Sequence, residues 1–389
     1  MSRIVRHVMS TSVYVHFPWC LQKCPYCDFA SATIRRPAVP HEAYADSVLR
    51  ELALRAPTRS SGPLESVFFG GGTPSLWEPA ELGRVLQAIL GTFEAVSPDV
   101  EVTVECNPSS LDAAKAAALR DAGVNRLSIG VQSLDDQRLR FLGRLHDQRL
   151  AVDAVRSALS EMPRVSADLM FGMPGQAPRD FLDEVERLLE LPLEHLSVYA
   201  LTIEPQTQFG ELHRKGKLPV AKEDAYADTF LETEALLAER GFDHYEVSNY
   251  AKPGQTSRHN QHYWRGGDYL GLGCAAVGCV DGRRYRNHPK PNDYDRASLT
   301  AQRVSELETE SELLGPQERV REALMLGLRT SEGVDLAALR ERAGVDPRTG
   351  RERAIERQQE RGNLAFAGER MNVPRSRWLQ LDSIVSELF

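Results

Sequence analysis

Short runs of β-branched and aromatic residues alternate with amphipathic runs over the first 250 residues. The β-rich runs predict six strands, at 13–17, 66–69, 100–105, 126–131, 165–169 and 195–200. The intervening periodicity predicts helices near 41–56, 78–92, 110–121, 148–160 and 178–190, then a helix over 222–240 and a strand near 244–248. For the third helix we expect Ser109 or Ser110 as N-cap, with Gly123 just past the end. Strands separated by helices indicate parallel βα units.

The polar positions within the strands distinguish a barrel from an open sheet. In the run 100–105, three valines share one face, whereas Glu101, Thr103 and Glu105 share the other. A doubly wound sheet, buried on both faces, would instead read as almost continuous apolar runs. Polar groups at the carboxyl ends of strands are typical of the top of a (β/α) barrel. We therefore predict an α/β fold, a partial (β/α)6 TIM-like barrel.

Past residue 310 the pattern changes. It predicts helices near 316–329, 335–343 and 350–361, a β pair around 364–373 and a last helix over 379–388, an order that resembles a winged helix. Residues 311–389 hold 13 Arg or Lys and 13 Asp or Glu. Because a DNA-binding module is usually basic, this balance favours a packing or partner role over DNA binding. We expect three parts: a barrel over 12–250, a connecting segment over 251–310 and a C-terminal domain over 311–389.

Composition narrows the class of protein. The chain has 389 residues, a formal net charge of −8 and 42% hydrophobic residues. The acidic balance argues against a nucleic-acid-binding surface, and no run of 18 uninterrupted apolar residues predicts a membrane span. The first ten residues lack the apolar run of a signal peptide, and Met9 is an alternative start to Met1. We expect a cytoplasmic protein.

Three cysteines near the N-terminus carry the strongest chemical signal. Cys20, Cys24 and Cys27 have the spacing CxxxCxxC, which suits three corners of a cubane iron–sulfur cluster and leaves one iron free for a small molecule. Two alternatives compete with the cluster. A disulfide with one spare thiol is rare in a cytosolic protein, and a zinc site would need a fourth ligand, for which His16 has suitable spacing.

A glycine-rich turn and four polar residues predict a ligand cavity. Gly70-Gly-Gly-Thr-Pro-Ser75 follows the second strand, and consecutive glycines let the backbone approach a ligand closely. It lacks the GK[ST] ending of a P-loop. Glu105, Gln132, Arg144 and Asp168 come from successive βα units and could line one cavity, where the arginine could hold a carboxylate in a bidentate fork. The alternative is a set of capping and loop hydrogen bonds.

The segment His259-Asn-Gln-His262-Tyr-Trp264 and the following Gly271-Leu-Gly-Cys274 are expected outside the barrel proper. Two histidines beside two aromatic residues could supply an axial ligand and a flat apolar wall for a haem-like macrocycle. The alternative is a loop whose aromatic residues cover the barrel mouth and whose histidines bond to the backbone.

Together these motifs identify a resemblance. They are YVHFPWCLQKCPYCDF, FFGGGTPS, ECNP, SIGVQS, the GR at 143–144, DLMFGMPG and HNQHYW. The chain resembles radical S-adenosylmethionine (SAM) proteins of the coproporphyrinogen dehydrogenase type, and within them the HemW branch, over about residues 12–385.

The resemblance implies cofactors and site residues. Cys20, Cys24 and Cys27 would bind three irons of a [4Fe–4S] cluster, and SAM would chelate the fourth iron. In this family the reduced cluster cleaves SAM to methionine and a 5′-deoxyadenosyl radical. The positions that contact SAM in the family correspond here to Tyr14, Gly71, Gly72, Thr73, Glu105, Gln132, Arg144 and Asp168, with Ala200 a less secure member.

Two departures from the dehydrogenases bear on function. Phe29 stands where those enzymes carry a fourth cysteine, and only 13 residues precede Tyr14, where they carry a longer extension. The HNxxYW motif marks the branch that binds haem and is thought to deliver it to apo-haemoproteins, which makes His259 the first candidate haem ligand and His262 the second.

The resemblance therefore implies a haem chaperone with a [4Fe–4S] cluster, SAM and haem. Its partners would be haem and apo-haemoprotein clients, with peripheral membrane contact, a homodimer and no nucleic acid. The alternative is an oxygen-independent coproporphyrinogen III dehydrogenase, and a radical-SAM enzyme with an unrelated substrate is a third hypothesis.

Overall fold

The computed structural model describes residues 10–389, so the alternative start at Met9 lies outside the described residues. Six parallel strands form the centre of the molecule and neighbour one another in chain order. They are β1 (Thr11–Phe17), β4 (Leu64–Gly71), β5 (Val96–Cys106), β6 (Arg126–Gln132), β7 (Arg164–Phe171) and β8 (His195–Ala200). The six predicted strands and the α/β partial-barrel class are confirmed.

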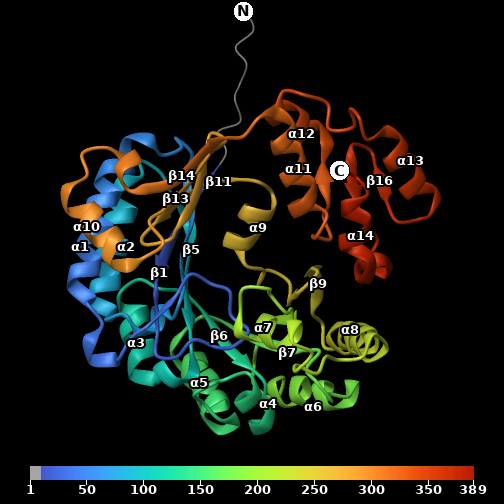
Figure 1. Cartoon of the computed structure of the whole chain (residues 1–389), viewed down its shortest axis with the longest axis horizontal. Coiled ribbons are helices and arrows are strands. Elements are labelled where there is room, and N and C mark those ends of the chain that lie inside the picture. The colour runs from blue at the N-terminus through green and yellow to red at the C-terminus, as the bar shows by residue number, and fades with distance from the viewer. Residues whose placement is uncertain (1–9) are drawn as a thin grey trace, which may run out of the picture.

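Helices cover the outer side of these strands (Figure 1). They are α1 (His41–Arg55), α2 (Pro79–Thr92), α3 (Ala113–Asp121), α4 (Asp136–Phe141), α5 (Gln148–Glu161), α6 (Pro178–Leu188) and α8 (Glu223–Glu239). The short helix α7 (Gln208–Arg214) lies instead against the cysteine segment, where the Phe209 N–H donates to the Pro25 carbonyl at 2.9 Å. Alternation along each strand separates the two faces. In β1, Val13, Val15 and Phe17 belong to the hydrophobic core, whereas Tyr14 and His16 bond to each other on the inner face.

The predicted N-cap of α3 is wrong. Ser109 and Ser110 belong to a short 3-10 turn, Pro108–Ser110, and the helix begins after Asp112. The Asp112 side chain accepts a hydrogen bond of 2.8 Å from the backbone N–H of Lys115, three residues into the helix. Aspartate satisfies the otherwise unpaired N–H groups of the first turn as well as serine does.

The segment 268–313 is part of the main sheet, which corrects our expectation of a connection outside the barrel. β11 (Asp268–Leu272) pairs in parallel with β1, and β12 (Val277–Val280), β13 (Arg283–Asn287) and β14 (Glu308–Leu313) follow as antiparallel strands. At the far edge, β10 (Asn249–Ala251) and β9 (Asp243–Glu246) extend the sheet beyond β8, which gives twelve strands among the described residues. Residues distant in sequence therefore flank the N-terminal strand.

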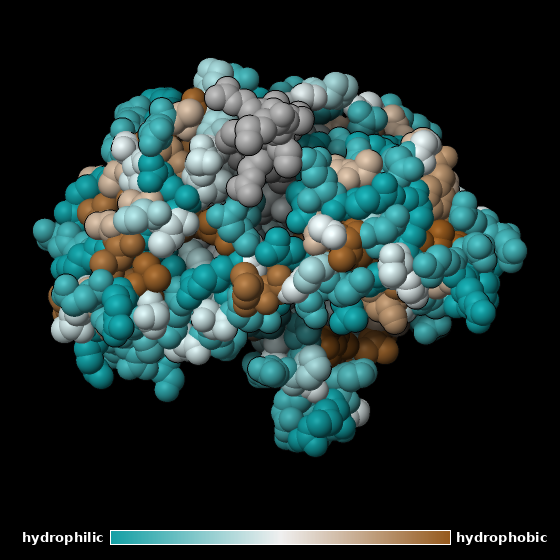
Figure 2. Space-filling view, turned by 90° about the horizontal axis from the view of Figure 1, so that it is seen from above, coloured by the Kyte–Doolittle hydropathy of each residue, from teal (hydrophilic) through white to brown (hydrophobic). Residues whose placement is uncertain are grey.

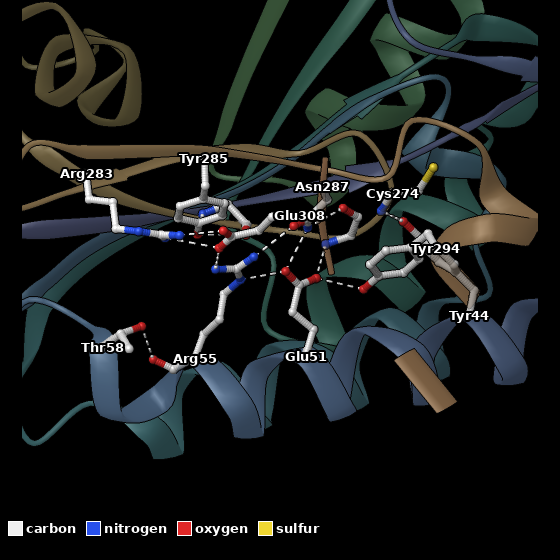
Figure 3. Close-up of polar contacts among 12 residues, drawn as sticks. Tyr44, Glu51, Arg55, Thr58, Cys274, Arg283, Tyr285, Asn287, Tyr294 and Glu308 are labelled. Atoms are coloured by element: carbon white, nitrogen blue, oxygen red, sulfur yellow. Dashed lines mark hydrogen bonds and ion pairs between the residues drawn. The ribbon is translucent and has the colours of Figure 1, made fainter. Parts of the chain in front are cut away.

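A buried polar network joins this extension to α1 (Figure 3). The Arg55 guanidinium bonds Glu51 at 2.6 Å, Glu308 at 3.0 Å and Asn287 at 2.8 Å. The second oxygen of Glu51 accepts hydrogen bonds from Tyr294 and from the backbone N–H of Gly273, both at 2.7 Å. Because the arginine and both carboxylates lie in the interior, each needs its partners to offset lost hydration.

The C-terminal residues form a separate lobe, drawn in orange to red in Figure 1. Its elements are α11 (Pro316–Gly327), β15 (Val334–Asp335), α12 (Leu336–Ala343), α13 (Glu352–Glu360), β16 (Ala365–Ala367), β17 (Arg370–Asn372) and α14 (Leu381–Ser386). The three short strands make one sheet in the order β15-β17-β16. An ion pair of 2.8 Å between Arg329 and buried Glu246 ties the lobe to β9. The winged-helix relationship stays a prediction.

The face of the molecule seen from above is largely hydrophilic, with separate hydrophobic patches (Figure 2). Among residues 10–389, the helices include none with both the length and the apolarity needed to cross a bilayer.

Candidate functional site

The loop after β1 brings the three clustered cysteines to one cavity of 340 Å³ at the carboxyl ends of the barrel strands. Thr73 Oγ1 lies 3.4 Å from Cys20 Sγ and donates to it. Arg144 Nη1 lies 3.5 Å from Cys24 Sγ. The backbone N–H of Cys27 donates to the carbonyl of Cys24 at 3.1 Å, which turns the loop back toward the cavity.

The donor set of this loop fits an iron–sulfur cluster. All six cysteines of the chain are free thiols, so no disulfide competes. In the described part of the chain, no three His, Cys, Asp or Glu side chains are grouped around a single metal position. A cubane cluster does not require such a group, because each thiolate binds a different iron. Burial raises the pKa of Cys27 to about 11, so metal binding would release protons.

His16 does not fit the alternative zinc site. Its Nε2 lies 2.8 Å from the Ala30 carbonyl and its Nδ1 lies 2.9 Å from the Tyr14 hydroxyl. Burial lowers the pKa of His16 to about 4, so the ring is neutral. With both ring nitrogens bonded, His16 has a structural role beneath the cysteine loop.

The glycine turn after β4 leaves no room for side chains. Gly71 has φ +108°, and a Cβ there would lie 2.6 Å from the His16 ring. A Cβ on Gly72 would lie 2.5 Å from the carbonyl oxygen of Trp19. The backbone N–H of Gly71 donates to Glu105 Oε2 at 3.2 Å. Glycine here allows the turn to pack against the strand that precedes the cysteine loop.

Two carboxyl groups lie deep in the barrel and are reached from the cavity. Burial, and to a lesser degree the charge of Asp168, raises the pKa of Glu105 to about 8. Burial also raises the pKa of Asp168, whose two oxygens each lie 3.2 Å from Ser128 Oγ. A neutral Glu105 can donate as well as accept a hydrogen bond, which suits it to a hydroxyl-bearing ligand.

Gln132 has a strained backbone conformation, and Arg144 has an unpaired buried donor. Gln132 has φ +67°, a left-handed conformation that costs a residue with a side chain about 1 to 2 kcal/mol. Arg144 Nη2 donates to the Gly130 carbonyl at 2.8 Å, but its buried Nε has no hydrogen-bond partner. Strain and an unpaired buried donor at a cavity wall are both features of ligand-binding sites.

Most of the predicted site residues meet at this cavity. Those that line it are Cys20, Cys24, Cys27, Gly71, Gly72, Thr73, Glu105, Gln132, Arg144, Asp168 and Ala200. Tyr14 lies behind the lining, where its ring would lie 2.9 Å from a Cβ on Gly70.

Sequence reasoning missed other lining residues, among them Tyr26, Ser128, Met170, Tyr199 and Thr202. Strand parity could have found three of them. Ser128 shares the inner face of β6 with Gly130, and the same alternation places Met170 beside Asp168 on β7 and Tyr199 beside Ser197 on β8.

The first candidate haem histidine does not line this cavity. The helix α9 (Arg258–Trp264) packs against the amino-terminal part of β4, at the opposite end of the barrel from the cysteine loop. His259 Nδ1 lies 2.8 Å from Ser66 Oγ, and its ring stacks on Phe68 at 4.8 Å. Burial lowers the pKa of His259 to about 3. A ligand role for His259 would place the haem iron inside the barrel.

The second candidate histidine lies one turn further along the same side of α9. Buried His262 has Nε2 2.7 Å from the Asp268 carbonyl and Nδ1 3.3 Å from a Glu65 oxygen. It lines a crevice of 930 Å³ that separates the barrel from the C-terminal lobe. The two histidines of the motif therefore face different compartments.

Family models match two parts of the chain. The radical SAM superfamily model matches residues 14–198, and the HemN C-terminal domain model matches residues 314–379. The chain is 41% identical to the haem chaperone HemW of Escherichia coli K12 over 72% of this chain and 74% of that protein. It is 35% identical to the haem chaperone HemW of Synechocystis over 86% of this chain and 81% of that protein.

The chain belongs to the HemW family of radical SAM proteins. Membership of the radical SAM superfamily implies a [4Fe–4S] cluster and SAM. A mouse relative, "Radical S-adenosyl methionine domain-containing protein 1, mitochondrial", is 38% identical over 83% of this chain and 74% of that protein.

The fold also resembles that of the E. coli coproporphyrinogen III oxidase HemN. That structure matches with a TM-score of 0.80 and 20% identity over 98% of this chain and 90% of that chain. At this identity the likeness concerns the fold alone.

Proposed function

We propose that this protein is a cytoplasmic haem chaperone that holds a [4Fe–4S] cluster and SAM in the barrel cavity and delivers haem to apo-haemoproteins. Membership of the HemW family carries the proposal, because its bacterial relatives bear the name of haem chaperones. The convergence of eleven predicted residues on one cavity supports the cofactor assignment.

In this proposal Cys20, Cys24 and Cys27 bind three irons of the cluster. Glu105 and Asp168 offer hydrogen bonds to the hydroxyl groups of SAM, and the unpaired Nε of Arg144 would donate to an acceptor on the ligand. The glycine turn supplies backbone groups at close range. The apo-haemoprotein clients and a homodimer are also parts of this proposal.

Coproporphyrinogen III dehydrogenation is the competing function. The fourth cysteine of those enzymes is replaced here by Phe29, which is exposed at the cavity rim. Anaerobic incubation of the cluster-loaded protein with coproporphyrinogen III, SAM and a reductant tests it, and we expect no protoporphyrinogen. Product formation would replace the chaperone proposal with the enzymatic one.

The chaperone proposal is tested by haem titration and handover. The anaerobically reconstituted protein is titrated with haem and followed by its absorbance, and we expect saturable binding. Haem-loaded protein is then mixed with an apo-b-type cytochrome. Direct handover predicts a transfer rate that rises with acceptor concentration, whereas passive release predicts a constant rate. Absence of saturable binding would refute the proposal.

A further inference from the structure

A second cavity, of 310 Å³, lies between the barrel and the C-terminal lobe, and we call it the inter-lobe slot. Its barrel side consists of the end of α9, β11 and the β12–β13 hairpin, and its lobe side consists of α11 and α12. It adjoins the larger crevice that His262 lines, since Gly267, Asp281, Ala323 and Arg342 line both. The tyrosine of the HNxxYW motif, Tyr263, lies in this slot.

Each wall of the slot has an apolar part, aromatic on the barrel side and aliphatic on the lobe side. Tyr263 and Tyr269 pack edge to face on the barrel side, with ring centroids 5.4 Å apart. Tyr269 is the direct register partner of Cys279 on the neighbouring strand, so the two side chains share one face. The lobe side presents Met325, Leu326 and Leu339. Aromatic and aliphatic walls on opposite sides suit a flat apolar ligand.

Two arginines in the slot lack a carboxylate partner. Within residues 10–389, neither Arg319 nor Arg342 takes part in an ion pair. Arg319 donates to the carbonyls of Leu314 and Asp281, and Arg342 donates to the carbonyls of Arg265 and Gly266. The Nε of Arg342 is buried and has no hydrogen-bond partner. Both guanidinium groups retain donors for an anion.

The other charged groups that line the slot are Arg284 and the carboxylates of Asp268, Asp281 and Glu322. Arg284 bonds Glu322, and the Asp268 carboxylate accepts the backbone N–H of Asp281 at 3.2 Å. Neither Asp268 nor Asp281 takes part in an ion pair among residues 10–389, so the formal charges of the lining balance, and the two arginines offer a ligand free hydrogen-bond donors rather than excess positive charge. A planar ligand with two carboxylates would match the apolar parts of the walls and the free donors of the two arginines.

The slot also contains a thiol. Cys279 Sγ is half-buried, and in the described structure it takes part in no hydrogen bond with another residue. Burial, with the charges of Asp268 and Glu322, raises the pKa of Cys279 to about 11, so the thiol is neutral without a metal. A ferric iron would deprotonate a thiol that it coordinates, and cysteine thiolate is an established axial ligand of haem.

We propose that the inter-lobe slot is the haem site, with the macrocycle between the tyrosine pair and α11, its propionates on Arg319 and Arg342, and its iron facing Cys279. This inference rests on the proposed function and assigns that function a place other than His259. It also gives a role to the tyrosine of the motif, which lines the slot, whereas His259 bonds Ser66 inside the barrel.

The test compares two glutamate substitutions at equally exposed positions. Met325 on α11 and Leu231 on α8 each expose 47% of their surface, so neither change should disturb the core. Met325→Glu puts a negative charge against the ring and propionates, and we expect at least a tenfold loss of haem affinity. Leu231→Glu is the matched control and should bind as the parent does. Cluster absorbance of each variant reports intact folding.

An iron-free probe separates the slot from the iron ligand. Protoporphyrin IX has the ring and both carboxylates but no metal. Met325→Glu should weaken protoporphyrin IX and haem alike, whereas Cys279→Ser should weaken only haem and should shift its Soret band. If the parent binds haem and Met325→Glu binds equally well, the slot is refuted while the chaperone function stands. If the parent binds no haem, the proposed function itself fails.

Discussion

The proton on Glu105 gives a measurable pH dependence of stability. Burial, aided by Asp168, raises its pKa from 4.5 to about 8 in the folded protein. From about pH 5 to pH 8, the folded state thus holds a proton that the unfolded chain has released. By linkage the free energy of unfolding falls as the pH rises through this window, by about 1.4 kcal/mol per pH unit. Below the window both states are protonated, and this contribution to stability is fully present.

Glutamine keeps the shape of this side chain and carries no titrating proton. The free energy of unfolding of Glu105→Gln relative to the parent should therefore increase by about 3 kcal/mol from pH 5.5 to pH 7.5. Urea unfolding of identically reconstituted anaerobic samples at three pH values measures the difference. The control is Glu94→Gln, because the Glu94 side chain is 96% exposed. Its difference from the parent should not change with pH.

A constant difference between Glu105→Gln and the parent across this range would refute the reasoning. It would mean that the folded protein holds Glu105 ionised, so that the Gly71 N–H at 3.2 Å and the other polar groups of the cavity outweigh burial. Glu105 could then only accept hydrogen bonds from a ligand, and its proposed role as a neutral donor would be lost.

Three further changes test other parts of the structure. Cys24→Ser should abolish the visible absorbance of the reconstituted cluster, whereas Cys274→Ser, at a buried thiol bonded to a backbone carbonyl, should retain it; equal absorbance would contradict the ligand assignment. Arg55→Met should lower the free energy of unfolding, measured with urea, by about 3 to 5 kcal/mol because it leaves buried carboxylates unpaired. Arg84→Met, at an exposed ion pair, should lower it by less than about 1 kcal/mol in the same experiment. Gln132→Gly relieves a left-handed conformation, so the free energy of unfolding should change by no more than about 1 kcal/mol. SAM binding, measured by equilibrium dialysis, should weaken. Unchanged SAM binding would show that the strain has no role in the site.

The sequence predicted the parallel core well because its signals are local. Alternation within each strand sets which residues face the helices, and punctuation such as Gly123 marks where helices end. The cysteine spacing and the glycine turn each occupy a few consecutive residues, so their chemistry is readable without knowing the fold. Even the missed Ser128 and Tyr199 obey the same parity as the residues that were found.

Only the tertiary structure decided how distant segments meet. The pairing of β11 with β1 joins residues more than 250 positions apart, and no local pattern encodes that partner. Likewise, two positions one turn apart in a short helix do not reveal that His259 stacks on Phe68 inside the barrel while Tyr263 lines the slot. The free energy that fixes these choices comes from burying α9 and closing the Glu51–Arg55 network across separate elements, so it exists only once the chain is packed.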